Sequence, residues 1–185
     1  MNLKNILRKL VPMRWQRPGK DDPIAMVLLL QMPHFFRAEE LQHAAEKAWG
    51  TSFAGGKGST HFVVQSGEVT FMKAGPHLLT FFTYPQPYIE NPKENIEWLR
   101  QASQRQAWVE HAACVGVDYM NKDVDVELAY CVLSKLVAEM ADENCTGVYI
   151  PRENILIPNG ESFYRELQKM ASSREPGVKQ VPELQ

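Results

Sequence analysis

The sequence predicts an α+β domain with a ferredoxin-like α/β sandwich at its core, in which the helices lie on one face of the sheet. The hydrophobic patterns between Ile24 and Asp118 read strand, helix, strand, strand, helix, strand, which is the element order of that core. The chain has 185 residues, 44% of them hydrophobic, enough for one ordinary domain that folds without metals or disulfides. We expect a further helix, strand and helix to extend this core at the C-terminus.

Composition divides the chain into three parts. We expect residues 1–22 to be a basic arm and linker, residues 23–172 to be a single α+β domain, and residues 173–185 to be a flexible tail. The linker is indicated by prolines, a glycine and mixed charges just before Ile24.

The first strand and the first helix have clear patterns. Ile24 to Met32 is almost entirely apolar and is closed by Pro33, which predicts a strand covered on both faces in the middle of a sheet. Apolar residues from Leu41 to Trp49 then recur at helical spacing, and Gly50 provides a stop.

A hairpin and a further β-rich run follow. The runs 61–65 and 69–73 flank a Ser66-Gly67 turn and predict two antiparallel strands. The run 78–84 either continues the second hairpin strand past a bulge at Gly75-Pro76 or makes the sheet larger than four strands.

The second half predicts two helices and a strand before the C-terminal extension. Asn91-Pro92-Lys93-Glu94 has the residue types of a helix N-terminus, so we expect a helix over 93–106. The run 109–117 predicts a strand near the first strand, and 126–140 predicts the most buried helix. Short strands at 146–150 and 155–157 and an amphipathic helix over 163–171 complete the chain.

Charge is segregated along the chain. The formal net charge is −2, and residues 1–20 sum to +6, so the remaining 165 residues sum to −8. An acidic body argues against a specific nucleic-acid-binding face. Leu3, Ile6, Leu7 and Leu10 lie at helical spacing among basic residues, so residues 1–20 are either a solvated tail or a weak contact to an anionic surface such as a membrane.

The sequence offers little local support for catalysis. Ala54-Gly-Gly-Lys-Gly-Ser-Thr60 resembles a phosphate loop only superficially, because Gly-Lys is not followed directly by Ser or Thr and the loop leads into a strand instead of a helix. We therefore predict no cofactor, no metal site and no catalytic residue. Cys114, Cys131 and Cys145 lack Cys-x-x-Cys spacing and are expected to be buried reduced thiols of a cytoplasmic protein.

The stretch from His77 to Tyr88 is the candidate contact surface. It concentrates aromatic residues and prolines and ends in Thr-Tyr-Pro-Gln-Pro-Tyr, and tyrosines beside prolines make rigid amphipathic anchors. His77, Tyr84 and Tyr88 are the predicted binding residues. The alternative is that these aromatic side chains only cover the core.

Several short motifs resemble a bacterial family catalogued as domain of unknown function four-two-six-one. They are Ile24-Ala-Met-Val-Leu-Leu-Leu30, Ala38-Glu-Glu-Leu41 with Trp49-Gly50, the Ser66-Gly67 turn, and Gly147-Val148-Tyr149. The resemblance spans roughly residues 24–150. It implies an α+β domain and no activity or functional residue.

These observations lead to two hypotheses about function. The first is a non-catalytic intracellular binding or adaptor domain with another protein as its partner. The alternative is a small-molecule-binding protein or enzyme whose cleft lies between sheet and helices and uses His77, His111 or Asp118.

Overall fold

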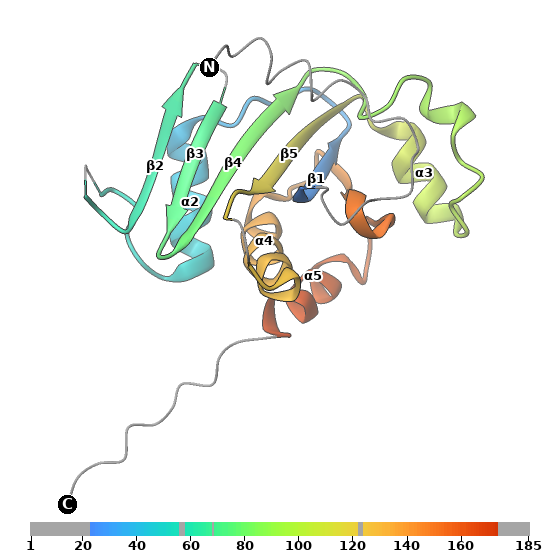
Figure 1. Cartoon of the computed structure of the whole chain (residues 1–185). Helices are drawn as coiled ribbons and strands as arrows, with labels where there is room; N and C mark the ends of the chain where they lie inside the picture. The colour runs from blue at the N-terminus through green and yellow to red at the C-terminus, as the bar shows by residue number, and fades with distance from the viewer. Residues whose placement is uncertain (1–22, 56–57, 68, 122–123, 174–185) are drawn as a thin grey trace, which may run out of the picture.

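The chain folds as an α+β domain built on one seven-stranded antiparallel sheet (Figure 1). The computed structural model describes residues 23–173 except 56–57, 68 and 122–123. The strands are β1 (Ile24–Leu30), β2 (His61–Ser66), β3 (Val69–Ala74), β4 (His77–Tyr84), β5 (Ala113–Tyr119), β6 (Cys145–Ile150) and β7 (Ile155–Pro158).

The strand order across the sheet is β2-β3-β4-β5-β1-β6-β7. As predicted, β1 is central and pairs with β5, and six of its seven residues are buried. The run 77–84 is a separate strand between β3 and β5, so the sheet is larger than four strands. A ferredoxin-like core is not confirmed by this order, because β4 and β5 separate the β2-β3 hairpin from β1.

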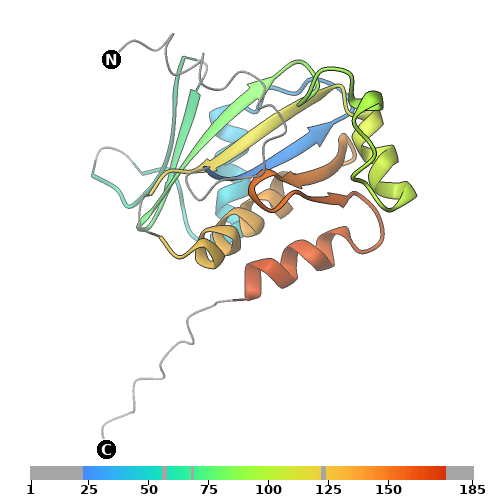
Figure 2. The same ribbon diagram turned by 45° about the vertical axis from the view of Figure 1, so that its right-hand side comes forward.

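Helices cover both faces of the sheet, but unequally (Figure 2). Helices α2 (Ala38–Trp49), α4 (Val126–Met140) and α5 (Phe163–Ser172) belong to the main hydrophobic core on one face. The short helix α3 (Ala102–Glu110) belongs to a second cluster on the opposite face, near β1 and β6. The prediction that the helices share one face is therefore wrong for α3.

The element boundaries differ from the predicted ones between residues 91 and 112. A helix over 93–106 was expected, but a 3₁₀ turn, Pro92–Glu94, forms at its start, and only residues 102–106 of that range are α-helical. Asn91 has a φ of 52°, a left-handed conformation in which its side chain caps nothing. The helix starts instead at Ala102, where Gln101 and Gln104 cap each other, and it continues to Glu110, so β5 begins four residues later than predicted.

The other predicted elements are present at nearly the predicted residues. Gly50 ends α2 with a φ of 63°, and Gly67, also at positive φ, makes the hairpin turn. All three cysteines are buried and free.

Some predictions fall on residues that the structure does not describe. The basic arm and linker, residues 1–22, lie outside the described residues, as do the tail from residue 174 and part of the glycine loop, residues 56–57. Among the described helices, none has both the length and the apolar composition needed to cross a membrane.

Candidate functional site

The strands β2, β3 and β4 carry apolar side chains on both of their faces. One set, which includes Met72, Leu79 and Phe81, packs into the main core under the helices. The other set alternates with it and points away from those helices. We call this second set the outer sheet face; its apolar members are Phe62, Val64, Val69, Phe71, Leu78 and Phe82.

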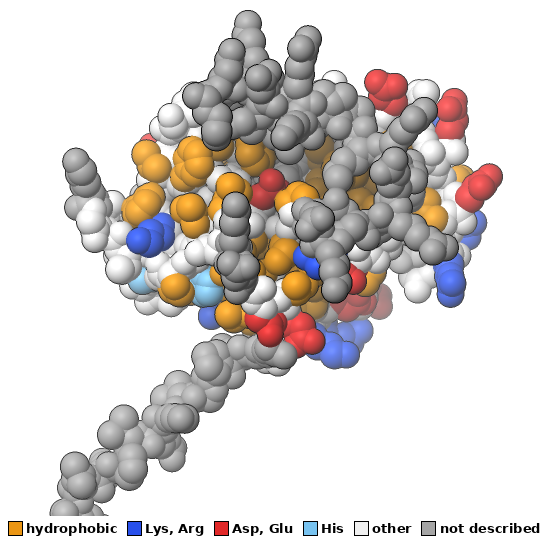
Figure 3. Space-filling view, in the orientation of Figure 1, with side chains coloured by type: hydrophobic (Ala, Val, Ile, Leu, Met, Phe, Trp, Pro, Cys, Tyr) orange, Lys and Arg blue, Asp and Glu red, His pale blue; other side chains and the backbone are white. Residues whose placement is uncertain are grey.

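The outer sheet face is accessible at its β2 side. The Val64 side chain is 48% exposed, and the other five apolar members are partly exposed. In the space-filling view, hydrophobic side chains gather over β2, β3 and β4 (Figure 3). An apolar surface contributed by three neighbouring strands is more than the scattered single hydrophobic residues normal on a protein surface.

One cross-strand row of this face contains two polar side chains. The register places Val64 opposite Phe71, Phe71 opposite Thr80, and Thr80 opposite Asp118, and Ala25 of β1 completes the row. The Thr80 side chain is buried, and its hydroxyl has no hydrogen-bond partner among the residues that the structure describes. Residues directly opposite each other have Cβ atoms about 5 Å apart, so Thr80 and Asp118 are immediate neighbours.

Asp118 is a carboxyl group in a poorly solvated position. Burial raises its pKa to about 6, because the charged form loses hydration. Within the described part of the chain, no hydrogen bond or ion pair reaches this carboxylate. A hydrogen-bond donor brought by a binding partner would therefore find two acceptors, the Asp118 carboxylate and the Thr80 hydroxyl oxygen.

Tyr84, one of the predicted binding residues, lies at the end of the same face. It is opposite Cys114, and its side chain is partly exposed. Burial, followed by the nearby charges of Asp118 and Cys114, raises the pKa of the Tyr84 hydroxyl. Tyr84 thus borders the outer sheet face, next to Phe82 along the face.

Tyr88 has a different environment from Tyr84. Its ring packs against Tyr149 at 5.4 Å and Trp108 at 6.3 Å between centroids, within the second hydrophobic cluster. Burial is also the first cause of the raised pKa of its hydroxyl. These contacts make Tyr88 a support for the proline segment, and they leave little of its ring available to a partner.

His111 fixes the proline segment to helix α3. Its Nδ1–H donates to the Trp108 carbonyl oxygen, so Nε2 is free to accept a hydrogen bond from the Tyr88 backbone N–H at 3.0 Å. Burial lowers the pKa of His111, which favours this neutral form. Both ring nitrogens are occupied, which is the arrangement of a structural histidine.

His77 is separated from the other two predicted binding residues. It accompanies Leu79 and Phe81 on the core side of β4, and its Nδ1 is hydrogen-bonded to the Tyr119 hydroxyl at 2.6 Å. His77 and Tyr84 are at opposite ends of β4, which at about 3.3 Å per residue places them roughly 23 Å apart. The structure brings Tyr84 next to the outer sheet face but does not bring His77 there.

The second hypothesis required His77, His111 or Asp118 to share a cleft. His77 and Asp118 point to opposite sides of the sheet, and His111 precedes β5 while Asp118 is near its end. Asp118 is five residues further along the strand than Ala113, about 17 Å away, so His111 is too far away to share a small ligand with Asp118. The space between the sheet and helices α2 and α4 is filled by core side chains.

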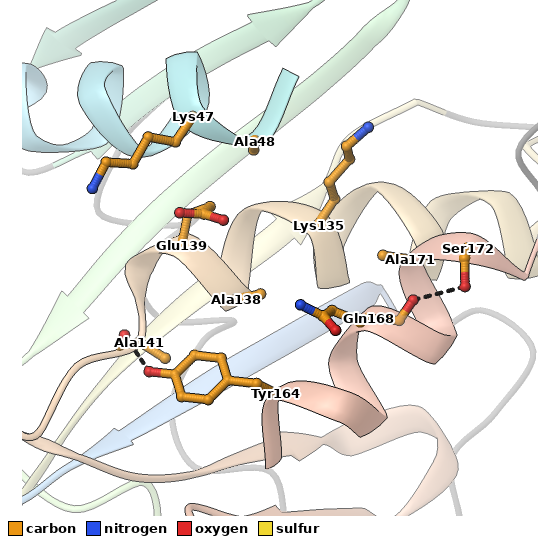
Figure 4. A pocket seen from close by; sticks show the side chains of 10 residues that line it. All are labelled: Lys47, Ala48, Lys135, Ala138, Glu139, Ala141, Tyr164, Gln168, Ala171 and Ser172. Atoms are coloured by element: carbon orange, nitrogen blue, oxygen red, sulfur yellow. Dashed lines mark hydrogen bonds between the residues drawn. The ribbon is translucent and has the colours of Figure 1, made fainter. Parts of the chain in front are cut away.

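An open groove lies on the helical layer, remote from the outer sheet face (Figure 4). It has a volume of about 620 Å³ and is formed where α2, α4 and α5 meet. Lys47, Lys135 and Glu139 are its charged lining residues, and the Tyr164 hydroxyl donates to the Ala141 carbonyl oxygen at 3.1 Å. Its sides combine apolar and oppositely charged groups, which does not define one ligand class.

The described residues give no metal-binding cluster. Among them, no group of three His, Cys, Asp or Glu side chains is placed to hold a metal ion. Burial raises the pKa of the Cys114 thiol to about 12, which keeps it protonated and unreactive at neutral pH.

Sequence reasoning missed most of the outer sheet face. The signal was present in β2 and β3, where apolar residues occupy both alternating positions, as in His-Phe-Val-Val and Val-Thr-Phe-Met. A strand with one solvated face normally carries polar residues at every second position. The departure from that rule at Phe62, Val64, Val69 and Phe71 marks the face.

The comparisons add no relative to this description. No protein-family model matches the chain, and no curated protein or solved structure matches it. The functional argument therefore depends on the site itself.

Proposed function

We propose that this chain is a non-catalytic binding or adaptor domain that recognises another protein through the outer sheet face. The observation that carries the proposal is the group of six apolar side chains that β2, β3 and β4 present together on this face, with Lys73 among them and Val64 48% exposed. Apolar side chains kept on a face that the helices do not cover contribute little to folding, and association with a partner would remove them from water.

The polar groups of the face define the chemistry of the partner. A partner segment would present apolar side chains toward Val64 and Phe71 and a donor, such as a lysine or arginine, toward Asp118. Removing Asp118 from water costs free energy that a charged donor offsets, so this contact would favour basic segments over acidic ones. Tyr84 lies at the border of the face, where a rigid amphipathic side chain adds contact area.

Two observations support a binding role over a catalytic one. The Cys114 thiol has a pKa of about 12, and both nitrogens of His111 are hydrogen-bonded to the backbone. Neither group is available as a nucleophile or general base. The small-molecule alternative would need a cleft between sheet and helices, where core side chains pack.

The finer expectations about the chain stay predictions. These are the ferredoxin-like core, the cytoplasmic location and the resemblance to the bacterial family. We propose them together with the binding role, but the outer sheet face could bind a partner protein without any of them.

The first prediction tests the face directly. Val64→Asp places a charge in its most exposed apolar position, so we expect the variant to lose partners that the wild-type chain retains in affinity purification from cells. A partner identified in this way should then bind the purified wild-type chain in calorimetry, and Val64→Asp should weaken its affinity at least tenfold.

Ile155→Asp is the matched control. Ile155 is 47% exposed on β7, at the other edge of the sheet, so the same charge is introduced at an equally exposed apolar position away from the face. If both variants retain the same partners with the same affinities, the proposal is wrong.

A further inference from the structure

We propose that the N-terminal segment, residues 1–22, docks its apolar stripe on the outer sheet face of the same molecule and is displaced when a partner binds. This inference rests on the proposed function, because it names the occupant of the same face in the free protein. The segment lies outside the described residues, so the argument uses its sequence and the described face.

The two surfaces have matching chemistry. Leu3, Ile6, Leu7 and Leu10 would form one apolar stripe on a helix, with Lys4, Arg8 and Lys9 beside it. Such a stripe is too short to be stable alone in water and gains stability by packing on another apolar surface. The outer sheet face is an apolar surface that the described helices α2, α4 and α5 leave open.

The point where the segment joins the domain is close to this face. The segment leads into β1 at Ile24, which pairs with Tyr119, and the next residue, Ala25, is opposite Asp118 in the row that reaches Val64. From β1 to β2 the sheet spans four strand spacings, about 19 Å. The 13 residues between Leu10 and Ile24 span up to about 45 Å when extended, so the stripe reaches every part of the face.

Tethering and charge both favour the intramolecular site. A short tether holds the stripe at an effective concentration in the millimolar range, so weak intrinsic affinity is sufficient for docking. Residues 1–22 sum to +4, because Asp21 and Asp22 offset two of the six basic charges, and the remaining residues sum to −6, so the segment is attracted to its own domain. A lipid surface is the competing site, but one short apolar face gives weak membrane binding by itself.

Photo-crosslinking of the full chain tests the docking. With benzoylphenylalanine in place of Leu7, irradiation should give adducts within one molecule, mapped by mass spectrometry to β2, β3 and β4. The same photoreactive residue in place of Asn5, on the opposite side of the stripe, should give at least fivefold fewer adducts there. Val64→Asp should lower the Leu7-position adducts at least fivefold, and Ile155→Asp should leave them unchanged.

Other outcomes would overturn the inference. They are adducts spread over the surface, adducts between isotope-labelled and unlabelled copies, and adducts to the lipid of phosphatidylserine vesicles with none to the sheet. The failure of this inference can be told apart from the failure of the proposed function. If Val64→Asp weakens partner binding while the position-7 adducts miss the sheet, the binding role stands and the docking does not.

Discussion

Asp118 reduces the stability of the folded chain at neutral pH, and it lies on the face that we propose for binding. The group has no charged or hydrogen-bonding partner among the described residues, and burial raises its pKa from 3.8 to about 6. A pKa that is higher in the folded state means that the folded chain binds the proton more tightly than the unfolded chain. The ionised carboxylate therefore opposes folding at neutral pH.

Asp118→Asn should stabilise the protein at neutral pH. Raising the pKa from 3.8 to about 6 lowers the free energy of unfolding by up to about 3 kcal/mol, and the full loss applies above about pH 6. The gain from the substitution should shrink as the pH falls below about 6 and should be mostly lost near pH 4, where the folded state is protonated and the unfolded state is close to its own pKa of 3.8. Urea unfolding of the two proteins between pH 4 and 8 measures this.

Glu143→Gln, at an exposed position, is the control and should change stability little at any pH. A loss of stability in Asp118→Asn at neutral pH would contradict this prediction.

His111 has the opposite relation to pH. Its neutral ring joins Tyr88 to Trp108, and its pKa in the folded state is lowered. Its stabilising contribution should therefore be present above the ordinary histidine pKa of 6.5 and be lost as the pH falls below it.

His111→Ala should destabilise the proline segment. The substitution leaves the buried Tyr88 N–H without its acceptor, which costs about 2 kcal/mol. Hydrogen exchange of the Tyr88 amide should accelerate at neutral pH, and the difference from wild type should decrease below pH 6.5. His43→Ala, at an exposed position of α2, should leave this amide unchanged, and equal exchange in both variants would contradict the role of His111.

At the residue scale, the sequence predicted some placements and missed others. Cys114 and Asp118 share a face of β5, as strand alternation requires. The burial of Tyr88 was not predictable, because it depends on Trp108 and Tyr149, which lie 20 and 61 residues later in the chain. The same limit applies to His77, whose partner Tyr119 comes from another strand.

At the scale of elements, the residue types that mark helix ends predicted those ends correctly where the backbone adopted the matching conformation. Gly50 ends α2 in the left-handed region, and the backbone N–H of Gly50 donates to the Glu46 carbonyl oxygen. Asn91 and Pro92 have the residue types of a helix start, but tertiary packing of Leu99 and Trp108 in the second cluster moves the helix to Ala102. Capping residues mark positions where a helix can begin, and tertiary packing determines whether the helix begins there.

Gly50→Ala tests this conformational requirement. A Cβ at position 50 meets no atom within 4 Å, so the expected cost of about 1 kcal/mol comes from the φ of 63° alone. Gly160→Ala is the matched control, because a Cβ there is equally unobstructed and its φ is not positive. Urea unfolding should separate the two variants, and equal stabilities would contradict the argument.

At the scale of the whole molecule, the α+β class could be predicted from the periodicity of the hydrophobic residues. The strand order of the sheet could not. The patterns identify single strands, whereas the order β2-β3-β4-β5-β1-β6-β7 depends on pairings between distant segments. The outer sheet face was missed for the same reason: its apolar character is visible in each strand, but the clustering of these side chains appears only when the strands are placed side by side.

The central position of β1 also has a consequence for synthesis on the ribosome. The partners of β1 are β5 and β6, and β5 begins at residue 113, long after β1 ends at residue 30. At roughly 5–20 residues per second, translation delays this pairing by about 4–16 s. During that interval the nascent chain carries an unpaired apolar strand. Chaperone binding to this strand should therefore affect the fraction of the protein that reaches the native state.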